Sequence, residues 1–232
     1  MRHSSRSTLL AATVAALSGV TAAPALADVV FADTEFSDSV WVLETVQLNA
    51  GGSASAAQSL GTGNPGNARR VTLSPNSGGT IWGFSRYGNT GATRYVPSTD
   101  GAIASIAFTF DARLVDGFGQ GQAVAISLKQ GQITFGASFD ITGSGGAWQT
   151  FASASLNAAD FSRLDGQSGT PNFSASGAPI RFGIASGNSS TSGSYTTIAD
   201  YDNFSVTVRQ VPTPASGAML VIGGLVAIRR RR

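Results

Sequence analysis

The chain has 232 residues, no cysteine and one histidine, His3. His3 lies in an N-terminal segment that we expect to be cleaved. The mature chain then lacks the side chains for disulfides, for a Ser-His-Asp or Cys-His mechanism, and for a His- or Cys-ligated zinc site. The formal net charge is +2, but residues 28–210 hold only nine of the 15 basic residues and all 13 acidic ones. This acidic middle removes the support for nucleic-acid binding.

Residues 1–27 have the pattern of a secretory signal peptide. Two arginines precede an apolar stretch over residues 9–23, and Ala25-Leu26-Ala27 forms a small-x-small cleavage pattern. We expect cleavage after Ala27 and export by the secretion machinery. A retained N-terminal membrane helix is the alternative, which the short apolar run and the Ala-Leu-Ala site disfavour.

Apolar side chains alternate with polar ones through residues 28–210, as in antiparallel strands with one buried face. Ile106, Phe108 and Phe110 share one such face, and Phe204, Val206 and Val208 share another. We expect strands near residues 40–47, 69–74, 80–86, 93–96, 102–114, 122–129, 132–141, 147–155, 180–186 and 202–210. Glycine-rich turns separate them. The pattern predicts one all-β domain, an antiparallel β-sandwich of jelly-roll type.

Two segments of the domain do not have a strand pattern. Residues 50–67 are polar and glycine-bearing, so we expect a surface loop there. Residues 156–164 favour a short helix, because Asn157 is a good N-cap and Asp160 stands three residues later, as in a capping box.

Glu35 and Glu44, the only glutamates, are the candidates for a pair of catalytic carboxylates. Glycoside hydrolysis is a common mechanism that needs two carboxylates and no histidine. Their spacing matches no catalytic strand motif, so we expect a noncatalytic protein with a structural or adhesive role. A carbohydrate-active enzyme (glycosidase or lyase) that uses acidic residues is the alternative.

Trp82, Arg86 and Tyr87 are the candidate ligand-binding residues. A sugar ring stacks on an aromatic face through its C–H groups, and a guanidinium binds its hydroxyls, so this segment favours polysaccharide as a partner. The alternative is core packing. Trp41 and Trp148 are expected in the core.

Asp200-Tyr201-Asp202-Asn203-Phe204 leads into the last expected strand. The segment resembles the ending of jelly-roll domains of the carbohydrate-binding and laminin-G-like type. That resemblance implies a structural calcium near the last strand, or simple pairing across the sheet. Asp200, Asp202 and Asn203 would supply oxygen ligands, and Asp33 would join them if the first and last strands are neighbours. The alternative is a set of Asx turns that start a strand.

Residues 211–232 form a tail with three parts: a proline motif, an uncharged apolar run over residues 215–228, and an arginine cluster. The motif consists of Val211, Pro212, Thr213, Pro214 and Ala215, and the chain ends in Arg229, Arg230, Arg231 and Arg232. As a helix the 14-residue run would span roughly 21 Å, less than the ~30 Å hydrocarbon core of a bilayer. The arginines would stay on the cytoplasmic side.

This tail resembles a PEP-CTERM sorting signal, with Thr213 where that family has Glu. The resemblance implies export through the inner membrane of a bacterium and transient membrane association. It also implies cleavage by an exosortase-type membrane protease and release to the cell surface or extracellular matrix. The alternative is a permanent C-terminal anchor helix.

Overall fold

The computed structural model describes residues 28–88, 93–117, 122–141 and 146–212. The β-sandwich lies within one compact unit that runs from Leu26 to Val211. The expected signal peptide, its cleavage site at Ala25 and Ala27, and the tail from Thr213 onward lie outside the described residues. Among the helices of the described ranges, none has the length and apolar character needed to cross a membrane.

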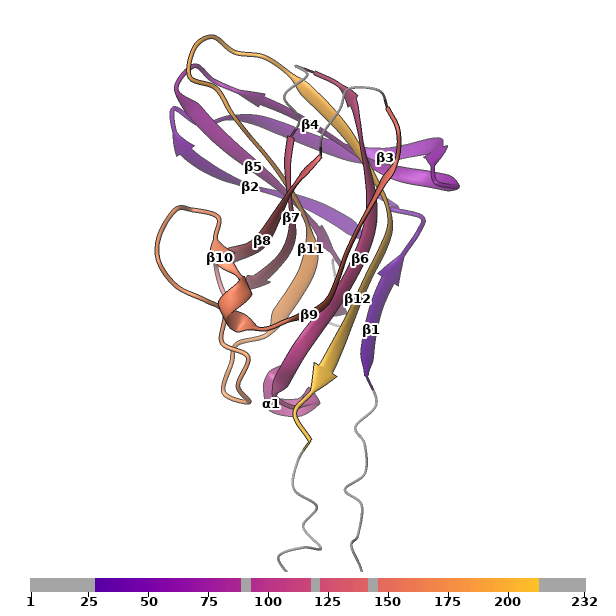
Figure 1. Cartoon of the computed structure of the whole chain (residues 1–232), viewed down its shortest axis with the longest axis vertical. Helices are drawn as coiled ribbons and strands as arrows, with labels where there is room; N and C mark the ends of the chain where they lie inside the picture. Colours follow the sequence, from indigo (N-terminus) through magenta and orange to yellow (C-terminus); the bar gives the residue numbers. More distant parts are fainter. Residues whose placement is uncertain (1–27, 89–92, 118–121, 142–145, 213–232) are drawn as a thin grey trace, which may run out of the picture. The chain divides into compact units, whose positions relative to one another are not determined.

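Twelve strands and one short helix are built from the described residues (Figure 1). The strands are β1 (Val29–Asp33), β2 (Trp41–Asn49), β3 (Gly52–Gly63), β4 (Gly66–Pro75), β5 (Gly79–Tyr87), β6 (Ile103–Asp116), β7 (Gln122–Gln130), β8 (Ile133–Ile141), β9 (Gln149–Leu156), β10 (Ser162–Arg163), β11 (Ile180–Ser189) and β12 (Thr197–Gln210). The helix is α1 (Pro97–Asp100).

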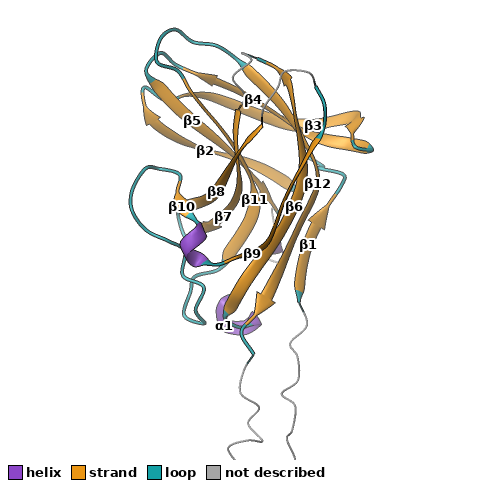
Figure 2. Ribbon diagram, viewed as in Figure 1, coloured by secondary structure: helices purple, strands orange, loops and turns teal. Residues whose placement is uncertain are grey.

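The strands form two antiparallel sheets, as Figure 2 shows. Sheet A has the order β3-β4-β12-β6-β9, with β1 also paired to β12. Sheet B has the order β10-β8-β7-β11-β5-β2. Neighbours in each sheet are mostly far apart in sequence, as jelly-roll connections require. The predicted antiparallel β-sandwich is confirmed.

The core lies between the two sheets and is built by the alternation seen in the sequence. Ile106, Phe108 and Phe110 of β6 face it, as do Phe204 and its alternate neighbours on β12. Trp41 is buried there and packs against Phe204 in a T-shaped contact, with 5.1 Å between the ring centroids. Burial of these aromatic rings is the main stabilising contribution, since each removes a large apolar area from water.

The expected loop over residues 50–67 is wrong, because most of it is strand β3 and the start of β4. Small residues at alternate positions let β3 lie flat on the core, with Ala54 opposite Leu73 and Ala56 opposite Val71 on β4. Small polar side chains have weak strand propensity on their own. Pairing with the apolar β4 supplies what local propensity does not.

Two further boundaries differ from the sequence pattern. Strand β1 was not expected, yet it pairs with the second half of β12 over its whole length. The expected strand over residues 93–96 is a single bridge between Tyr95 and Ile180, and α1 follows it directly. Pro97 has no amide hydrogen and its φ suits the first turn of a helix, which ends the extended stretch.

The short helix expected after residue 156 is confirmed as one 3₁₀ turn, Ala158–Asp160. The Asn157 side chain caps it, and Asp160 accepts a hydrogen bond from the Asn157 amide at 2.7 Å. The turn begins a long connection that carries β10 along the edge of β8 and continues to β11. This connection brings Leu164 onto the outer face of sheet B.

Candidate functional site

The outer face of sheet B, which points away from the core, carries the site. Residues of β5 alternate across the sheet: Ile81 belongs to the core, whereas Trp82 and Phe84 pack in a separate apolar cluster on the other side. Arg86 follows the same alternation and points outward with Trp82. The period of two along this strand therefore sets an indole, a phenyl ring and a guanidinium on one surface.

Glycines of β11 let these rings lie flat on the sheet. A Cβ on Gly187 would lie 2.5 Å from carbons of the Trp82 indole, and one on Gly183 would lie 2.8 Å from the Phe84 ring. No side chain can occupy that space, so glycine is required opposite Trp82 at Gly187 and diagonally from Phe84 at Gly183. The indole is partly exposed, whereas Phe84 is fully buried.

Phe84, between Trp82 and Arg86 on β5, divides this face into two parts. It is buried with Leu164, Ala125 and Ala185 in one apolar cluster, and Trp82 packs against that cluster. The Trp82 side is apolar and partly open. The other side, toward Arg86, opens into a charged pocket.

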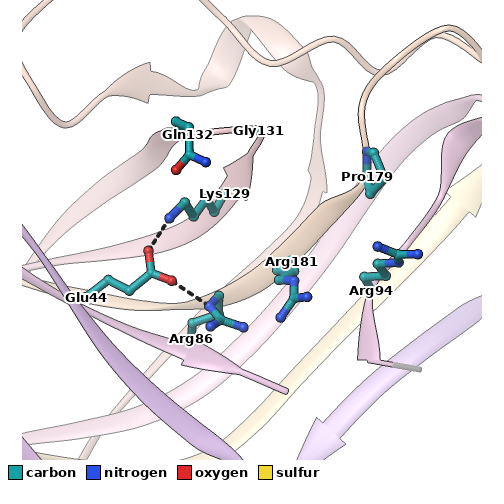
Figure 3. Close-up of a pocket in the computed structure, with 8 residues that line it drawn as sticks. All are labelled: Glu44, Arg86, Arg94, Lys129, Gly131, Gln132, Pro179 and Arg181. Carbon is teal, nitrogen blue, oxygen red and sulfur yellow. Dashed lines mark hydrogen bonds and ion pairs between the residues drawn. The ribbon is translucent and has the colours of Figure 1, made fainter. Parts of the chain in front are cut away.

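That pocket has a volume of about 430 Å³, within the ~300–1,000 Å³ range of small-molecule sites (Figure 3). It is formed by strands β2, β5, β7 and β11 with the β7–β8 turn and residues beside α1. The lining residues are Glu44, Arg86, Arg94, Lys129, Gly131, Gln132, Pro179 and Arg181. Four of the eight are cationic and one is anionic.

Glu44 accepts hydrogen bonds from two of the cations. Arg86 Nε lies 2.8 Å from Glu44 Oε1, and Lys129 Nζ contacts Glu44 Oε2. Burial by itself raises the pKa of the Glu44 carboxyl, but the hydrogen bonds and charges of Lys129 and Arg86 outweigh it and leave the pKa below its ordinary value. Glu44 is therefore a firmly ionised carboxylate.

Arg181 and Arg94 have no acidic partner within ion-pair distance in the described part of the chain. Arg181 Nη1 donates a hydrogen bond of 3.2 Å to the carbonyl of Gly88, which Arg86 Nη1 also approaches at 2.5 Å. Burial lowers the pKa of Arg181, and the positive charges of Arg86 and Arg94 lower it further. The three guanidinium groups lie near one another in Figure 3 and together form a cationic wall.

The three predicted ligand-binding residues do not share one surface. Trp82 and Arg86 lie on the outer face of sheet B, on opposite sides of Phe84. Tyr87 points to the other side of β5, where its ring lies 5.4 Å from Trp41 and 5.6 Å from Phe204. Burial raises the pKa of the Tyr87 hydroxyl, and the charge of Asp33 adds to the effect. Tyr87 therefore packs as a core-border residue.

The structure places the predicted calcium ligands Asp33 and Asp200 in contacts of their own, whereas Asp202 and Asn203 stay together. Strands β1 and β12 are neighbours, as expected, and Asp33 pairs with Phe204 in register. The Asp33 carboxylate, however, accepts hydrogen bonds from the amides of Glu35 and Phe36 at 2.6 and 2.7 Å. These bonds form an Asx turn at the end of β1.

Asp200 and Asp202 point to the outer face of sheet A but into two different networks. Asp200 is bound by Arg70 at 2.7 Å and by Arg113 at 2.8 Å. Asp202 accepts hydrogen bonds from the backbone amides of Asn64 and Asn203, the latter at 2.6 Å. Within the described ranges, no group of three His, Cys, Asp or Glu side chains is placed to hold a metal ion.

Asn203 instead joins Asp111, a residue that the sequence did not single out. Asn203 Nδ2 lies 2.7 Å and Asn64 Nδ2 3.1 Å from Asp111 Oδ2, while Thr150 Oγ1 lies 2.6 Å from Oδ1. These bonds fasten the β3–β4 hairpin onto the outer face of sheet A. Trp148, expected in the core, lies at this face with the Arg113 guanidinium 4.7 Å from its ring centre.

Glu35 and Glu44 do not form a catalytic pair. Glu35 is exposed and accepts a hydrogen bond from Asn67 Nδ2 at 2.8 Å, next to the β3–β4 hairpin, whereas Glu44 lies in the pocket of sheet B. A general acid for glycoside hydrolysis needs a raised pKa, and the pKa of Glu44 is lowered.

Sequence reasoning missed most of the pocket residues. Lys129, Arg94 and Arg181 come from three separate segments, and only the pairing of β11 with β7 places Arg181 directly opposite Lys129. The one available signal was strand parity, because Arg181 alternates with the core residues Ile180 and Phe182.

Comparison with known proteins gives no relative by sequence: no protein-family model and no curated protein matches. Several solved structures resemble the chain. A family 11 carbohydrate-binding module from Clostridium thermocellum, in complex with a β-1,3-1,4-mixed-linked tetrasaccharide, has 13% identity, covers 79% of this chain and 98% of its own, and gives a TM-score of 0.47.

Two further structures resemble the chain with similar identities and TM-scores. The C-terminal family 22 carbohydrate-binding module of Clostridium thermocellum Xyn10B has 13% identity, covers 79% of this chain and 96% of its own, and gives a TM-score of 0.46. The CBM22-1 xylan-binding domain from Paenibacillus barcinonensis Xyn10C has 10% identity, 82% and 99% coverage, and a TM-score of 0.41. Identities and scores this low do not transfer a ligand or an activity to this chain.

Proposed function

We propose that this chain is an exported, noncatalytic protein of the cell surface or extracellular matrix that binds polysaccharide on the outer face of sheet B. The observation that carries the proposal is the composition of that face. It presents a partly exposed indole laid flat on a glycine and, beyond Phe84 on the same strand, a pocket of about 430 Å³ lined by charged and polar side chains.

This combination suits a sugar chain. A flat aromatic ring offers a stacking surface for the C–H face of a pyranose, and charged groups in a concave pocket bind hydroxyls with fixed direction. Strand registry holds both features rigidly, because Trp82 and Arg86 stand four residues apart on one strand. A preorganised face loses little entropy on binding.

Delivery to the surface rests on the two end segments. The signal-peptide pattern of residues 1–27 and the PEP-CTERM-like tail of residues 211–232 support export and sorting by an exosortase-type protease. Mass spectrometry of the mature protein from its host tests this part. We expect an N-terminus at Asp28 and loss of the arginine cluster; a mature chain that ends at Arg232 would favour a permanent anchor.

A glycan array combined with a hydrolysis assay tests the binding part. We expect the full-length chain to retain at least one class of polysaccharide and to release no reducing ends from it. Turnover that disappears in a Glu44→Gln variant would overturn the noncatalytic reading. Absence of binding to every glycan would overturn the proposed function itself.

A further inference from the structure

The pocket on sheet B has an excess of positive charge that the rest of the domain does not share. Residues 28–210 contain nine basic and 13 acidic residues, yet four of those nine basic residues line this single pocket. Glu44 is the only acidic side chain among the lining residues. A cluster of like charges costs free energy in the unliganded protein, and an anion bound there would offset that cost.

Arginines elsewhere in the described structure generally have a carboxylate partner. Arg69 contacts Asp38, Arg70 and Arg113 contact Asp200, and Arg163 contacts Asp165. In the described ranges only three arginines form no ion pair, and these are Arg94, Arg181 and Arg209. Two of the three lie together in the pocket, so the guanidinium donors that they do not use, all but Arg181 Nη1 on the Gly88 carbonyl, are available to an incoming group.

The contacts of Glu44 show that side chains of this pocket bind a carboxylate. Its carboxylate is held between the Arg86 guanidinium and the Lys129 ammonium, with one oxygen directed at each (Figure 3). Arg181 pairs directly across from Lys129 on the neighbouring strand, and Arg94 lies on the same rim. Planar guanidinium forks match the two oxygens of a carboxylate better than they match neutral hydroxyls.

We infer that the pocket recognises an acidic saccharide. Arg181 and Arg94 bind the oxyanion of the sugar. Glu44, held by Arg86 and Lys129, accepts hydrogen bonds from the sugar hydroxyls. This inference rests on the proposed function and names its ligand class. A uronic acid carboxylate and a sugar sulfate share the required chemistry. The volume of about 430 Å³ favours one charged sugar unit, whereas an extended basic stripe would be needed for a nucleic-acid backbone.

The test measures binding of three hexasaccharides to the full-length chain by isothermal titration calorimetry: oligogalacturonate, which carries only carboxylates, a carrageenan hexamer, which carries only sulfates, and neutral cellohexaose. At least one acidic hexamer is expected to bind about tenfold or more tightly than the neutral one. That preference should shrink between 50 mM and 500 mM salt, because exposed charge interactions are screened. The tighter of the two acidic ligands identifies the oxyanion.

Variants assign the effect to the pocket. Arg181→Gln and the exposed Arg94→Gln should each weaken acidic-hexamer binding about tenfold. Arg209→Gln removes the same charge from an exposed arginine on sheet A and should leave the affinity unchanged. Arg181→Lys keeps the charge without the fork and should retain intermediate affinity. Circular dichroism verifies that each variant is folded. If Arg181→Gln does not fold, the affinity of Arg94→Gln alone tests the inference.

The outcomes separate the inference from the proposed function. Equal affinity for acidic and neutral hexamers, unchanged by the arginine variants, would overturn the inference and leave polysaccharide binding standing. Failure to bind any hexamer or any glycan on the array would overturn both. A single-stranded oligonucleotide that bound more tightly than both acidic hexamers would also overturn the inference.

Discussion

The outer face of each sheet carries a cluster in which cationic side chains surround one carboxylate. The two clusters differ in whether every cation has an acidic partner. On sheet A, Arg70 and Arg113 both bind Asp200, whose side chain is 0% exposed. On sheet B, Arg86 and Lys129 share Glu44, whose side chain is 27% exposed, and two further arginines have no acidic partner among the described residues. The first cluster is closed by its own hydrogen bonds, and the second is open.

The difference teaches how to distinguish a structural network from a binding site in a fold of this kind. A closed network satisfies every charge within the protein, so its removal should affect stability and leave ligand binding unchanged. An open cluster retains unused donors, so its removal should affect binding more than stability. The following predictions test that contrast, from the largest expected effect to the smallest.

Asp200→Asn should destabilise the domain by about 2–4 kcal/mol, because it leaves two arginines without their buried counter-charge. Urea unfolding followed by circular dichroism measures the change. Asp140→Asn is the matched control, since Asp140 is exposed and forms no ion pair with a described residue. A loss below about 1 kcal/mol, within the range of exposed pairs, would show that the cluster on sheet A is not closed.

Trp82→Ala should weaken polysaccharide binding about tenfold, or about 1.4 kcal/mol, through loss of the stacking surface. Trp148→Ala is the control, because Trp148 lies at the outer face of sheet A against Arg113. Calorimetric titration compares the two. If Trp148→Ala weakens binding more than Trp82→Ala, the ligand binds sheet A, which would contradict the proposed site on sheet B.

Glu44→Gln should have opposite effects on binding and stability. The amide oxygen that replaces the carboxylate still accepts a hydrogen bond from a sugar hydroxyl, while the lost negative charge frees Arg86 and Lys129 for the oxyanion. Acidic-saccharide binding should therefore strengthen by several-fold. The free energy of unfolding should fall by less than about 1 kcal/mol at pH 7, since the pair is partly exposed. Weaker binding of the acidic ligand in this variant would contradict binding of the oxyanion in this pocket.

The pH dependence of the Glu44 contribution follows from its lowered pKa. For a carboxyl with a depressed folded-state pKa, the stabilisation is complete above the unfolded value, near 4.5, and is lost as pH falls through the folded value. The stability difference between wild type and Glu44→Gln should therefore be constant from pH 7 to about 5 and shrink below that. Chemical unfolding at a series of pH values measures it; a difference that grew on acidification would contradict the lowered pKa.

Calcium should have the smallest effect. Asp33 caps an Asx turn and Asp200 is neutralised by two arginines, so the predicted ligands lie in separate contacts. Adding calcium to chelator-treated protein should leave the melting temperature unchanged. A calcium-dependent rise, abolished by Asp202→Ser, would restore a metal site near the last strand.

Much of the fold could be predicted because alternation is a local signal. The faces of β6, β7, β8 and β12 follow from it directly, and Ile106 or Phe204 needs no tertiary information to be placed in the core. Strand β3 could not be predicted, because Ala54 and Ala56 carry a strand only when Leu73 and Val71 pair with them.

The site was less accessible to sequence reasoning. Trp82 and Arg86 stand on one strand and could be found together, but their partners Lys129, Arg181 and Arg94 are brought in by strand order. Leu164 is also placed by tertiary structure, since a long connection folds it onto the sheet. For the predicted calcium set, sequence reasoning assigned the wrong partners: Asp200 is held by Arg70 and Arg113, whereas Asp202 and Asn203 bind the β3–β4 hairpin at Asn64.

The central claim is that the saccharide binds the outer face of sheet B. Two-dimensional amide NMR of the ¹⁵N-labelled protein, titrated with an acidic hexasaccharide, reports this residue by residue. We predict that the perturbed amides lie on β5, β7 and β11, around Arg86, Lys129 and Arg181. Perturbations confined to sheet A around Ala107 and Ser205, where a shallower surface pocket lies, would contradict the account.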